Sequence, residues 1–233
     1  MYKKRLDGRK FEELRETGAK VGVVKRADGS AMFSIGKTTA IAAVYGPREL
    51  HPKFLQDPSK GILRCNYNMM AFSGSGDMVR PGTSRRSREI SFVTAGALMP
   101  VLDLNDFPGT VVDVFVEIIQ SDAGTRCAGI CAASMALADA GFPMKDLVSA
   151  VSVGRVDDKI VVDLNKEEED YHEGNGVADI AVAMMPRSGK LTLLQNDGIV
   201  SKDELLKAIE LAREACKNIY EIQKKALLEK YKI

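Results

Sequence analysis

Apolar and polar positions alternate in four short stretches of the first third of the chain. A period of two is typical of strands that bury one face, so these stretches predict β-strands. Asp28-Gly29 and Gly36-Lys37 separate the first three and are typical hairpin turns, which makes the arrangement an antiparallel meander. The predicted strands cover residues 20–25, 31–35, 38–45 and 62–71.

The same alternation returns in the second half of the chain, where stretches with a helical period interrupt it. The strands predicted there are 111–119, 147–156, 160–163, 177–185 and 191–195. Apolar residues three and four positions apart predict helices. These cover residues 11–14, 85–100 and 201–231, and one more runs from the turn at 123–126 to Gly141. Strands and helices together predict an α/β (α+β) protein.

A glycine turn, Ala123-Gly124-Thr125-Arg126, joins the strand at 111–119 to the small-residue helix that follows it. The first backbone N–H groups of a helix have no partner within the helix and carry the positive end of its dipole. The turn can therefore hold an anion, phosphate above all. A tight strand-to-helix connection without a ligand is the alternative, since no P-loop lysine follows the turn.

Three arginines, Arg85, Arg86 and Arg88, occupy the first turn of the predicted helix at 85–100. The helix dipole disfavours cations there by roughly a few tenths of a kcal/mol each, so local stability does not explain them. Arginine forks match phosphate geometry, and the preceding glycine-rich segment is expected to be mobile without a ligand. We therefore expect anion binding here, ahead of pairing with Glu89 and solvation.

An acidic segment, 165–176, precedes the predicted strand 177–185, in which Asp179 is set among apolar residues. A solvated loop is the default interpretation of such a charged run. Because Asp170 and Asp179 bracket one loop, their carboxylates could converge on a hard cation such as Mg²⁺.

Composition and charge exclude several other classes of protein. The 233 residues are 45% hydrophobic with a net charge of +1, so a sizeable core is expected and any contact with a polyanion must be local. No run approaches the roughly 18 apolar residues of a membrane span. The charged N-terminus predicts a cytoplasmic protein without membrane association.

The four cysteines and two histidines have neither zinc-ligand spacing nor the pattern of a Ser-His-Asp triad. The cysteines are expected to be small reduced core residues.

Four ordered motifs resemble the RNase PH superfamily and span nearly the whole chain. They read RLDGR near the N-terminus, SRRSREIS at a helix start, QSDAGTRCAGICAASMALADAGFPM, and VDLNKEEEDYHEGNGVADIAVAMMP. The chain is most similar to the branch of this family that supplies the catalytic subunit of the archaeal exosome.

The resemblance implies one RNase PH-like domain, residues 1–233, with two packed halves at about 1–105 and 106–233. Each half is then a mixed sheet backed by helices, and a long C-terminal helix ends the chain. The implied activity is phosphorolytic 3′→5′ RNA degradation, in which inorganic phosphate releases nucleoside diphosphates and the reverse reaction adds 3′ tails. The implied partners are RNA, a related non-catalytic subunit that alternates in a hexameric ring, and RNA-binding cap proteins.

The resemblance also implies which residues act. The family's phosphate loop falls on Gly124, Thr125, Arg126 and Cys127. Its RNA-binding positions fall on Arg85, Arg86 and, in a loop that narrows the central channel, Lys53. Its acidic positions fall on Asp170 and Asp179, which are expected to be catalytic and to hold a divalent cation, Mg²⁺ above all. Since phosphate is the attacking group, no side-chain nucleophile is needed.

Two alternatives stay open from the sequence. One is a homohexameric RNase PH that trims tRNA 3′ ends; the SRRSREIS motif and the long charged C-terminal helix favour the exosome branch over it. The other is a ring subunit that binds RNA without cutting it. Such a subunit is expected to lack part of the set of arginines and aspartates that this chain contains.

Overall fold

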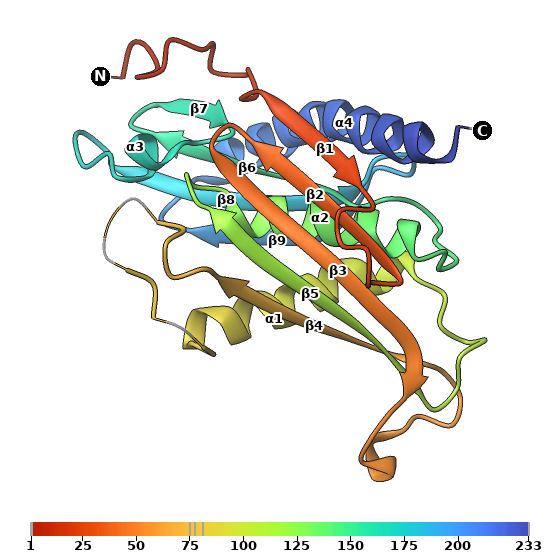
Figure 1. Ribbon diagram of the computed structural model, residues 1–233. Coiled ribbons are helices and arrows are strands. Elements are labelled where there is room, and N and C mark those ends of the chain that lie inside the picture. The colour runs from red at the N-terminus through yellow and green to blue at the C-terminus, as the bar shows by residue number, and fades with distance from the viewer. Residues whose placement is uncertain (1, 75, 77, 81, 233) are drawn as a thin grey trace.

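The computed structural model describes residues 2–74, 76, 78–80 and 82–232 and contains two β-sheets with helices packed between them (Figure 1). The first sheet has the strand order β1-β2-β3-β5-β4. Its strands are β1 (Thr17–Val21), β2 (Gly29–Ile35), β3 (Thr38–Glu49), β4 (Ile62–Met69) and β5 (Thr110–Gln120). Neighbouring strands are antiparallel except β4 and β5, which are parallel.

The second sheet is antiparallel throughout and has the order β7-β6-β8-β9. Its strands are β6 (Ser149–Val156), β7 (Lys159–Val162), β8 (Val177–Met185) and β9 (Lys190–Asp197). The first sheet takes β5 as well as β1 to β4, so the two sheets divide the chain after β5 rather than near residue 105. The cause is the pairing of β5 with both β3 and β4. That the whole chain is a single domain stays a prediction.

Three helices form a layer between the sheets. They are α1 (Arg85–Leu98), α2 (Thr125–Asp139) and α4 (Lys202–Tyr231). α1 contacts β4 and β9, α2 contacts β2, β3 and β6, and α4 contacts β1 and β6. The remaining helical turns are η1 (Lys53–Leu55), η2 (Met99–Val101) and the short α3 (Lys166–Glu169). Within the described residues, no helix combines the length and the apolar character needed to cross a membrane.

α2 is the most deeply buried of these helices, because every residue in it except Arg126 and Ala138 is buried. Its side chains are mostly Ala, Cys, Gly and Ser, which let neighbouring backbones come close. A Cβ atom added to Gly29 of β2 would lie 2.2 Å from the backbone nitrogen of Ala140, just after the helix. α2 and β2 therefore pack too closely to leave room for a side chain at position 29.

All four cysteines are free thiols in the buried core. Burial raises the pKa of Cys65 and of Cys131 to about 12. Burial also raises the pKa of Cys127 and of Cys216 well above the ordinary value. The thiols therefore stay protonated at neutral pH, in agreement with the prediction that they are small reduced core residues.

The helix predicted at 11–14 is wrong. The segment forms only a turn, in which the Glu13 N–H donates to the Lys10 carbonyl at 3.2 Å. The Glu13 carbonyl accepts from the side chains of Arg5 and Arg9, at 3.2 and 2.8 Å, rather than from a helical N–H. The first strand also lies at Thr17–Val21 rather than 20–25, because Gly22 adopts a left-handed conformation with φ of 73° and ends it.

The glycine-rich segment before α1 was expected to be mobile without a ligand. Its positions 75, 77 and 81 lie outside the described residues, so that expectation stays a prediction.

The N-terminal segment is attached to the second sheet through a buried ion pair. Arg5 is 2% exposed and donates to the Glu168 carboxylate through Nε at 2.8 Å and Nη2 at 2.7 Å. The same guanidinium donates to the carbonyls of Val162 and Asp163, at 2.8 and 2.7 Å. The Tyr2 hydroxyl donates to Glu168 at 2.7 Å. The RLDGR motif is therefore a structural anchor for α3.

Replacing Arg5 with alanine is expected to lower the free energy of unfolding by roughly 3–5 kcal/mol, because it leaves the Glu168 carboxylate buried without its partner. Urea denaturation measures the change. Lys217→Ala is the control, since Lys217 pairs with Glu214 at 2.8 Å on an exposed face and its loss should change stability by less than about 1 kcal/mol. Equal losses in the two variants would contradict the role assigned to burial.

Candidate active site

The predicted glycine turn forms between β5 and α2. Ala123 and Gly124 both have left-handed backbone conformations, with φ of 58° and 63°. Gly124 is the N-cap of α2, and no side chain caps the helix there, so its first N–H groups are available to a ligand. Thr38 of β3 fixes the turn: its hydroxyl donates to the Ala123 carbonyl at 2.7 Å and accepts from the Asp122 N–H at 2.9 Å.

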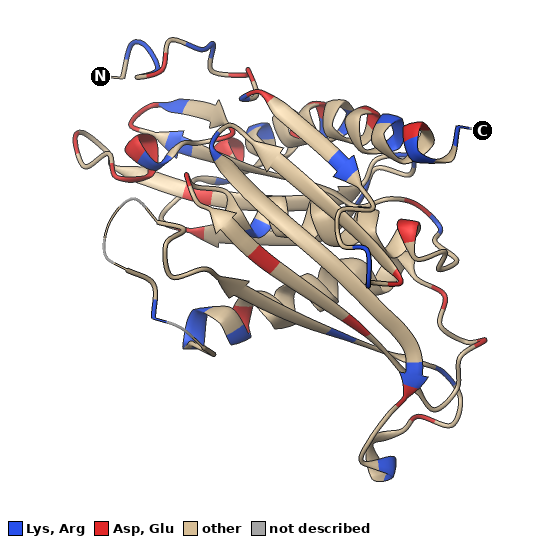
Figure 2. Cartoon of the chain, in the orientation of Figure 1, with Lys and Arg blue, Asp and Glu red and all other residues tan. Residues whose placement is uncertain are grey.

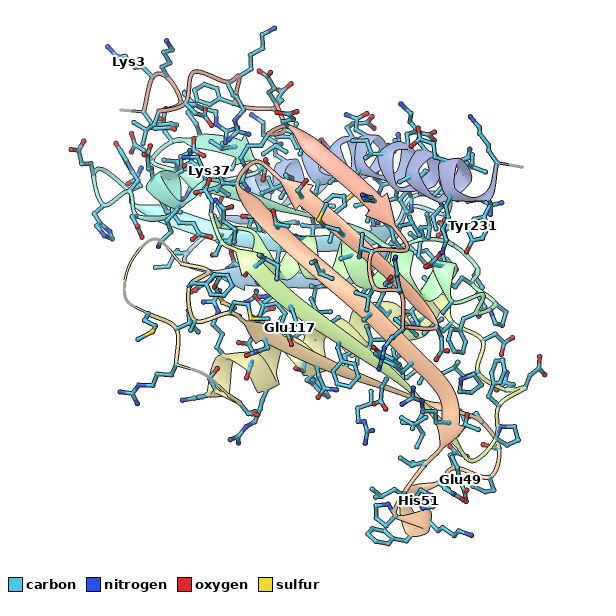
Figure 3. All side chains as sticks on the ribbon, viewed as in Figure 1. Lys3, Lys37, Glu49, His51, Glu117 and Tyr231 are labelled. Atoms are coloured by element: carbon cyan, nitrogen blue, oxygen red, sulfur yellow. The ribbon has the colours of Figure 1, made fainter. Side chains whose placement is uncertain are left out.

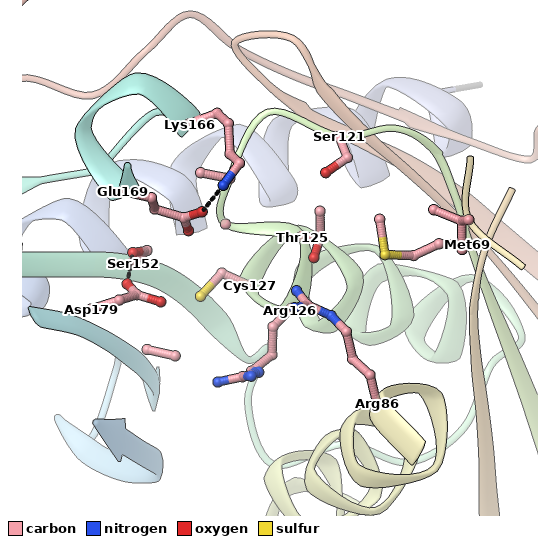
Figure 4. A pocket seen from close by; sticks show the side chains of 14 residues that line it. Met69, Arg86, Ser121, Thr125, Arg126, Cys127, Ser152, Lys166, Glu169 and Asp179 are labelled. Atoms are coloured by element: carbon pink, nitrogen blue, oxygen red, sulfur yellow. Dashed lines mark hydrogen bonds and ion pairs between the residues drawn. The ribbon is translucent and has the colours of Figure 1, made fainter. Parts of the chain in front are cut away.

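A cavity of about 330 Å³ lies over this turn (Figure 4). Both sheets contribute to it, together with the starts of α1 and α2 and the helix α3. Apolar side chains such as Met69 and Val79 line part of it. The polar and charged side chains around the turn include those of Arg86, Ser121, Arg126, Ser152, Lys166, Glu169 and Asp179.

Two arginines form the basic wall of the cavity, Arg86 from α1 and Arg126 from α2 (Figure 4). The start of α1 is one of the basic segments in Figure 2. Arg126 Nη2 lies 3.8 Å from Glu89 Oε1, while its Nε is buried and has no hydrogen-bond partner among the described residues. Leaving a buried charged donor unpaired is unfavourable, so a bound anion would stabilise this arrangement.

Two carboxylates form the opposite wall, Glu169 and Asp179. The Ser152 hydroxyl donates to Asp179 Oδ1. Burial raises the pKa of Asp179, although the Ser152 hydrogen bond and the charge of Arg126 oppose this. Burial and the charge of Asp179 raise the pKa of Glu169 to about 7, against the lowering effect of Lys166, whose Nζ lies 3.9 Å away. Glu169 can therefore carry a proton near neutral pH.

Two models of one protein family match consecutive parts of the chain. The first, described as 3′ exoribonuclease family, domain 1, covers residues 13–143, and the second, domain 2 of the same family, covers residues 146–215. The chain belongs to the 3′ exoribonuclease family. This confirms the resemblance to the RNase PH superfamily found in the sequence motifs.

Members of the 3′ exoribonuclease family in archaea match the chain over nearly its full length. "Exosome complex component Rrp41" of Thermococcus kodakarensis is 57% identical over 228 residues, which cover 98% of this chain and 90% of that protein. The protein of the same name from Methanopyrus kandleri is 50% identical and covers 97% of this chain and 93% of its own length.

Solved structures of the family have the same fold. Rice Rrp46 matches with a TM-score of 0.84 at 24% identity, over 96% of this chain and 100% of that one. A structure of the Archaeoglobus fulgidus exosome with RNA bound to the active site matches with a TM-score of 0.78 at 22% identity. The match covers 98% of this chain and 93% of that one. The predicted RNase PH-like fold, with two sheets backed by helices and a long C-terminal helix, is confirmed.

Most of the residues predicted from the family resemblance line this one cavity. They are Arg86, Gly124, Thr125, Arg126, Cys127 and Asp179. Arg85 is exposed at the first position of α1, beside Arg86, but does not line it. Lys53 lies in η1, and its Nζ is 3.7 Å from Glu49. This loop is at one end of the first sheet, where Figure 3 labels Glu49 and His51.

Asp170 faces a different hollow. It lines a second cavity, of about 650 Å³, with Lys37 and Phe72, and it is 2.5 Å from Lys166 Nζ with 58% of its side chain exposed. Successive residues of a helix point about 100° apart. α3 therefore directs Glu169 into the first cavity, and Asp170, one position later, away from it. The structure does not bring the predicted pair Asp170 and Asp179 together.

Among the polar residues that line the cavity, the sequence did not identify Ser121, Ser152, Lys166 and Glu169. A signal for Glu169 existed: Asn165 and Glu168 have capping-box spacing, and they form the box in the structure. That box fixes where α3 begins and hence which acidic residue faces the cavity. No comparable signal marks Ser152, because β6 is buried along its whole length.

A divalent cation in this cavity would need the substrate to complete its ligands. Among the described residues, no group of three or more His, Cys, Asp or Glu side chains is placed to hold a metal ion. The cavity offers the carboxylates of Glu169 and Asp179, and oxygen donors of this kind suit Mg²⁺. The donor set fits a magnesium ion that phosphate oxygens also bind.

The raised pKa of Glu169 predicts a pH dependence of stability. A carboxyl group whose pKa is higher in the folded protein contributes stability below its unfolded pKa of about 4.5 and loses it as the pH rises to about 7. Glu169→Gln should remove this loss, so the stability of the variant relative to the natural protein should increase between those pH values. Urea denaturation across the range measures it, and a constant difference would show that the pKa of Glu169 is not raised.

Proposed function

We propose that this chain is the phosphorolytic 3′→5′ exoribonuclease subunit of an archaeal-type exosome. The observation that carries the proposal is the single cavity in which an uncapped helix start, Arg86 and Arg126 face Glu169 and Asp179. Such an arrangement suits a reaction in which one phosphate attacks another and the leaving group needs a proton. The names of the archaeal relatives, exosome components, support the assembly.

Inorganic phosphate binds at the turn of Gly124, Thr125 and Arg126, where helix N–H groups and the Arg126 guanidinium neutralise it. One of its oxygens attacks the phosphorus of the last phosphodiester of the RNA. The bond from that phosphorus to the 3′ oxygen of the penultimate nucleotide breaks, and a nucleoside diphosphate leaves. Arg86 holds the negative oxygens of the phosphate under attack.

Glu169 takes the acidic role that the sequence assigned to Asp170. In its protonated form it gives a proton to the departing 3′ oxygen, which a pKa of about 7 permits at neutral pH. Asp179, oriented by Ser152, is the carboxylate that would hold a divalent cation together with phosphate oxygens. When bound, magnesium supplies positive charge that neutralises the oxygens of the substrate.

The remaining partners follow from the same assignment. RNA reaches the cavity past Arg85, and Lys53 contacts RNA at a distance from it, in the exposed loop at the end of the first sheet. A related, non-catalytic subunit alternates with this chain in a six-membered ring, and RNA-binding cap proteins complete the assembly.

Mixing the chain with its ring partner, RNA and inorganic phosphate should release nucleoside diphosphates, identified by chromatography. Arg126→Ala should raise the phosphate concentration for half-maximal rate by roughly tenfold or more, because it removes a charged hydrogen-bond donor to that phosphate. Arg88→Ala is the control, since Arg88 is exposed on α1 and does not line the cavity. Release of nucleoside monophosphates, or no dependence on phosphate, would refute phosphorolysis.

Substitutions of Glu169 and Asp170 distinguish the proposed mechanism from the one predicted from the sequence. Glu169→Gln should lower kcat by roughly 10²-fold, the usual contribution of a general acid, while leaving RNA binding nearly unchanged. Asp170→Asn should lower it by less than about threefold, because Asp170 is exposed and faces the neighbouring hollow. A larger loss in the Asp170 variant would return the acidic role to that residue.

A further inference from the structure

Asp122 connects the phosphate-binding turn to the helix that carries Glu169. It directly precedes Ala123, and its Oδ1 accepts the backbone N–H of Lys166, the first residue of α3, at 3.1 Å. Asp122 is thus joined through its backbone to the turn at which phosphate binds, and through its carboxylate to the helix from which the proton comes. Asp122 itself does not line the cavity.

A buried arginine fixes Asp122 in place. Arg15 is 8% exposed, and its Nη1 donates to the Asp122 carbonyl and lies 3.4 Å from Asp122 Oδ2. The same guanidinium donates to Asp163 through Nε at 2.9 Å and Nη2 at 2.7 Å. Asp163 is 1% exposed and lies three positions before α3. Asp122 is therefore held from the side of the second sheet as well as from its own turn.

α3 depends on such outside contacts because it has only four residues. A single helical turn is unstable alone, since nucleation fixes several residues for one hydrogen bond. An acceptor at the first N–H satisfies a group that has no partner within the helix, and negative charge there is favourable to the dipole. Arg5 holds α3 from one side through Glu168, and Asp122 holds its first residue.

We propose that Asp122 is a positioning residue: its carboxylate ties α3 to the phosphate-binding turn and so fixes the distance between the bound phosphate and Glu169. The inference rests on the proposed phosphorolytic function for its kinetic consequence. The link between Asp122 and α3 can be tested without any reaction.

Three substitutions of Asp122 distinguish the effect of the position of its side-chain oxygen from the effect of its negative charge. Asp122→Asn loses the charge but keeps an oxygen that can accept the Lys166 N–H. Asp122→Glu keeps the charge but carries it one methylene further from the backbone. Asp122→Ala loses both. Because the Asp122 side chain is 22% exposed and its backbone contacts to Thr38 and Arg15 do not need the carboxylate, the variants are expected to fold.

The kinetic experiment uses the chain assembled with its ring partner, RNA and inorganic phosphate. The Ala and Glu variants should lose roughly 10- to 100-fold in kcat, the effect of misplacing a catalytic group by about 1 Å, while the Asn variant stays within about threefold. The phosphate concentration for half-maximal rate should change by less than about threefold in all of them, because the turn itself is intact. Two results would overturn a positioning role. One is an Ala variant that retains activity, and the other is an Asn variant that loses activity while the Glu variant keeps it.

The second experiment needs no activity. Amide hydrogen exchange of Lys166, followed by NMR on the isolated chain, should be faster in the Ala and Glu variants and unchanged in Asn, at equal midpoints of urea unfolding. Equal exchange in the natural protein and the Ala variant would overturn the proposed link even if the kinetics changed. A natural protein that releases no nucleoside diphosphate would instead refute the proposed function, and the exchange result would still decide whether Asp122 holds α3.

Discussion

The close packing of α2 between the two sheets is the contact on which the site depends. A Cβ atom on Gly129 of this helix would lie 3.0 Å from Val116 of β5, and on the opposite side Cys131 Sγ accepts the Ala150 N–H of β6 at 3.2 Å. A helix of larger side chains would hold the sheets further apart. α2 begins at the glycine turn, which follows β5 of the first sheet. Because α2 is thin, this turn lies next to Glu169 and Asp179, which are attached to the second sheet.

Arg86 and Arg126 face Glu169 and Asp179 across the cavity, and the charge of Arg126 does not offset the effect of burial on Asp179. Arg126 is 3.8 Å from Glu89, outside strong hydrogen-bond range, and the pKa of Asp179 is raised in spite of the arginine's charge. An anionic substrate placed between the walls would complete the contacts of the guanidinium and raise the proton affinity of the acids further. Substrate binding and proton availability would thus favour each other.

The sequence predicted the parts of the site that are determined locally. The glycine turn and its place between strand and helix needed only Gly124 and the patterns on either side, and α2 formed where it was expected. Family resemblance supplied the partners of the turn, Arg86 and Asp179, which are distant in sequence but line the same cavity.

The sequence pattern could not predict which residue of the short helix α3 faces the cavity. Four consecutive acidic residues, 167–170, look alike in sequence, and only the start of α3 decides that Glu169 faces the cavity. The helix expected at 11–14 failed for a different reason: the Glu13 carbonyl accepts from the side chains of Arg5 and Arg9 instead of a helical N–H. Neither the start of α3 nor the side-chain hydrogen bonds to the 11–14 segment can be predicted from the local periodicity of apolar residues.

The burial of all four cysteines has a practical consequence for labelling the protein. Thiol reagents attack the thiolate, and each native thiol is both buried and held protonated. A single cysteine introduced on the surface would therefore be the only fast-reacting thiol in the folded chain. Fluorophores or crosslinkers could be attached there, for example in the exposed loop around Lys53, while the core cysteines stay in place.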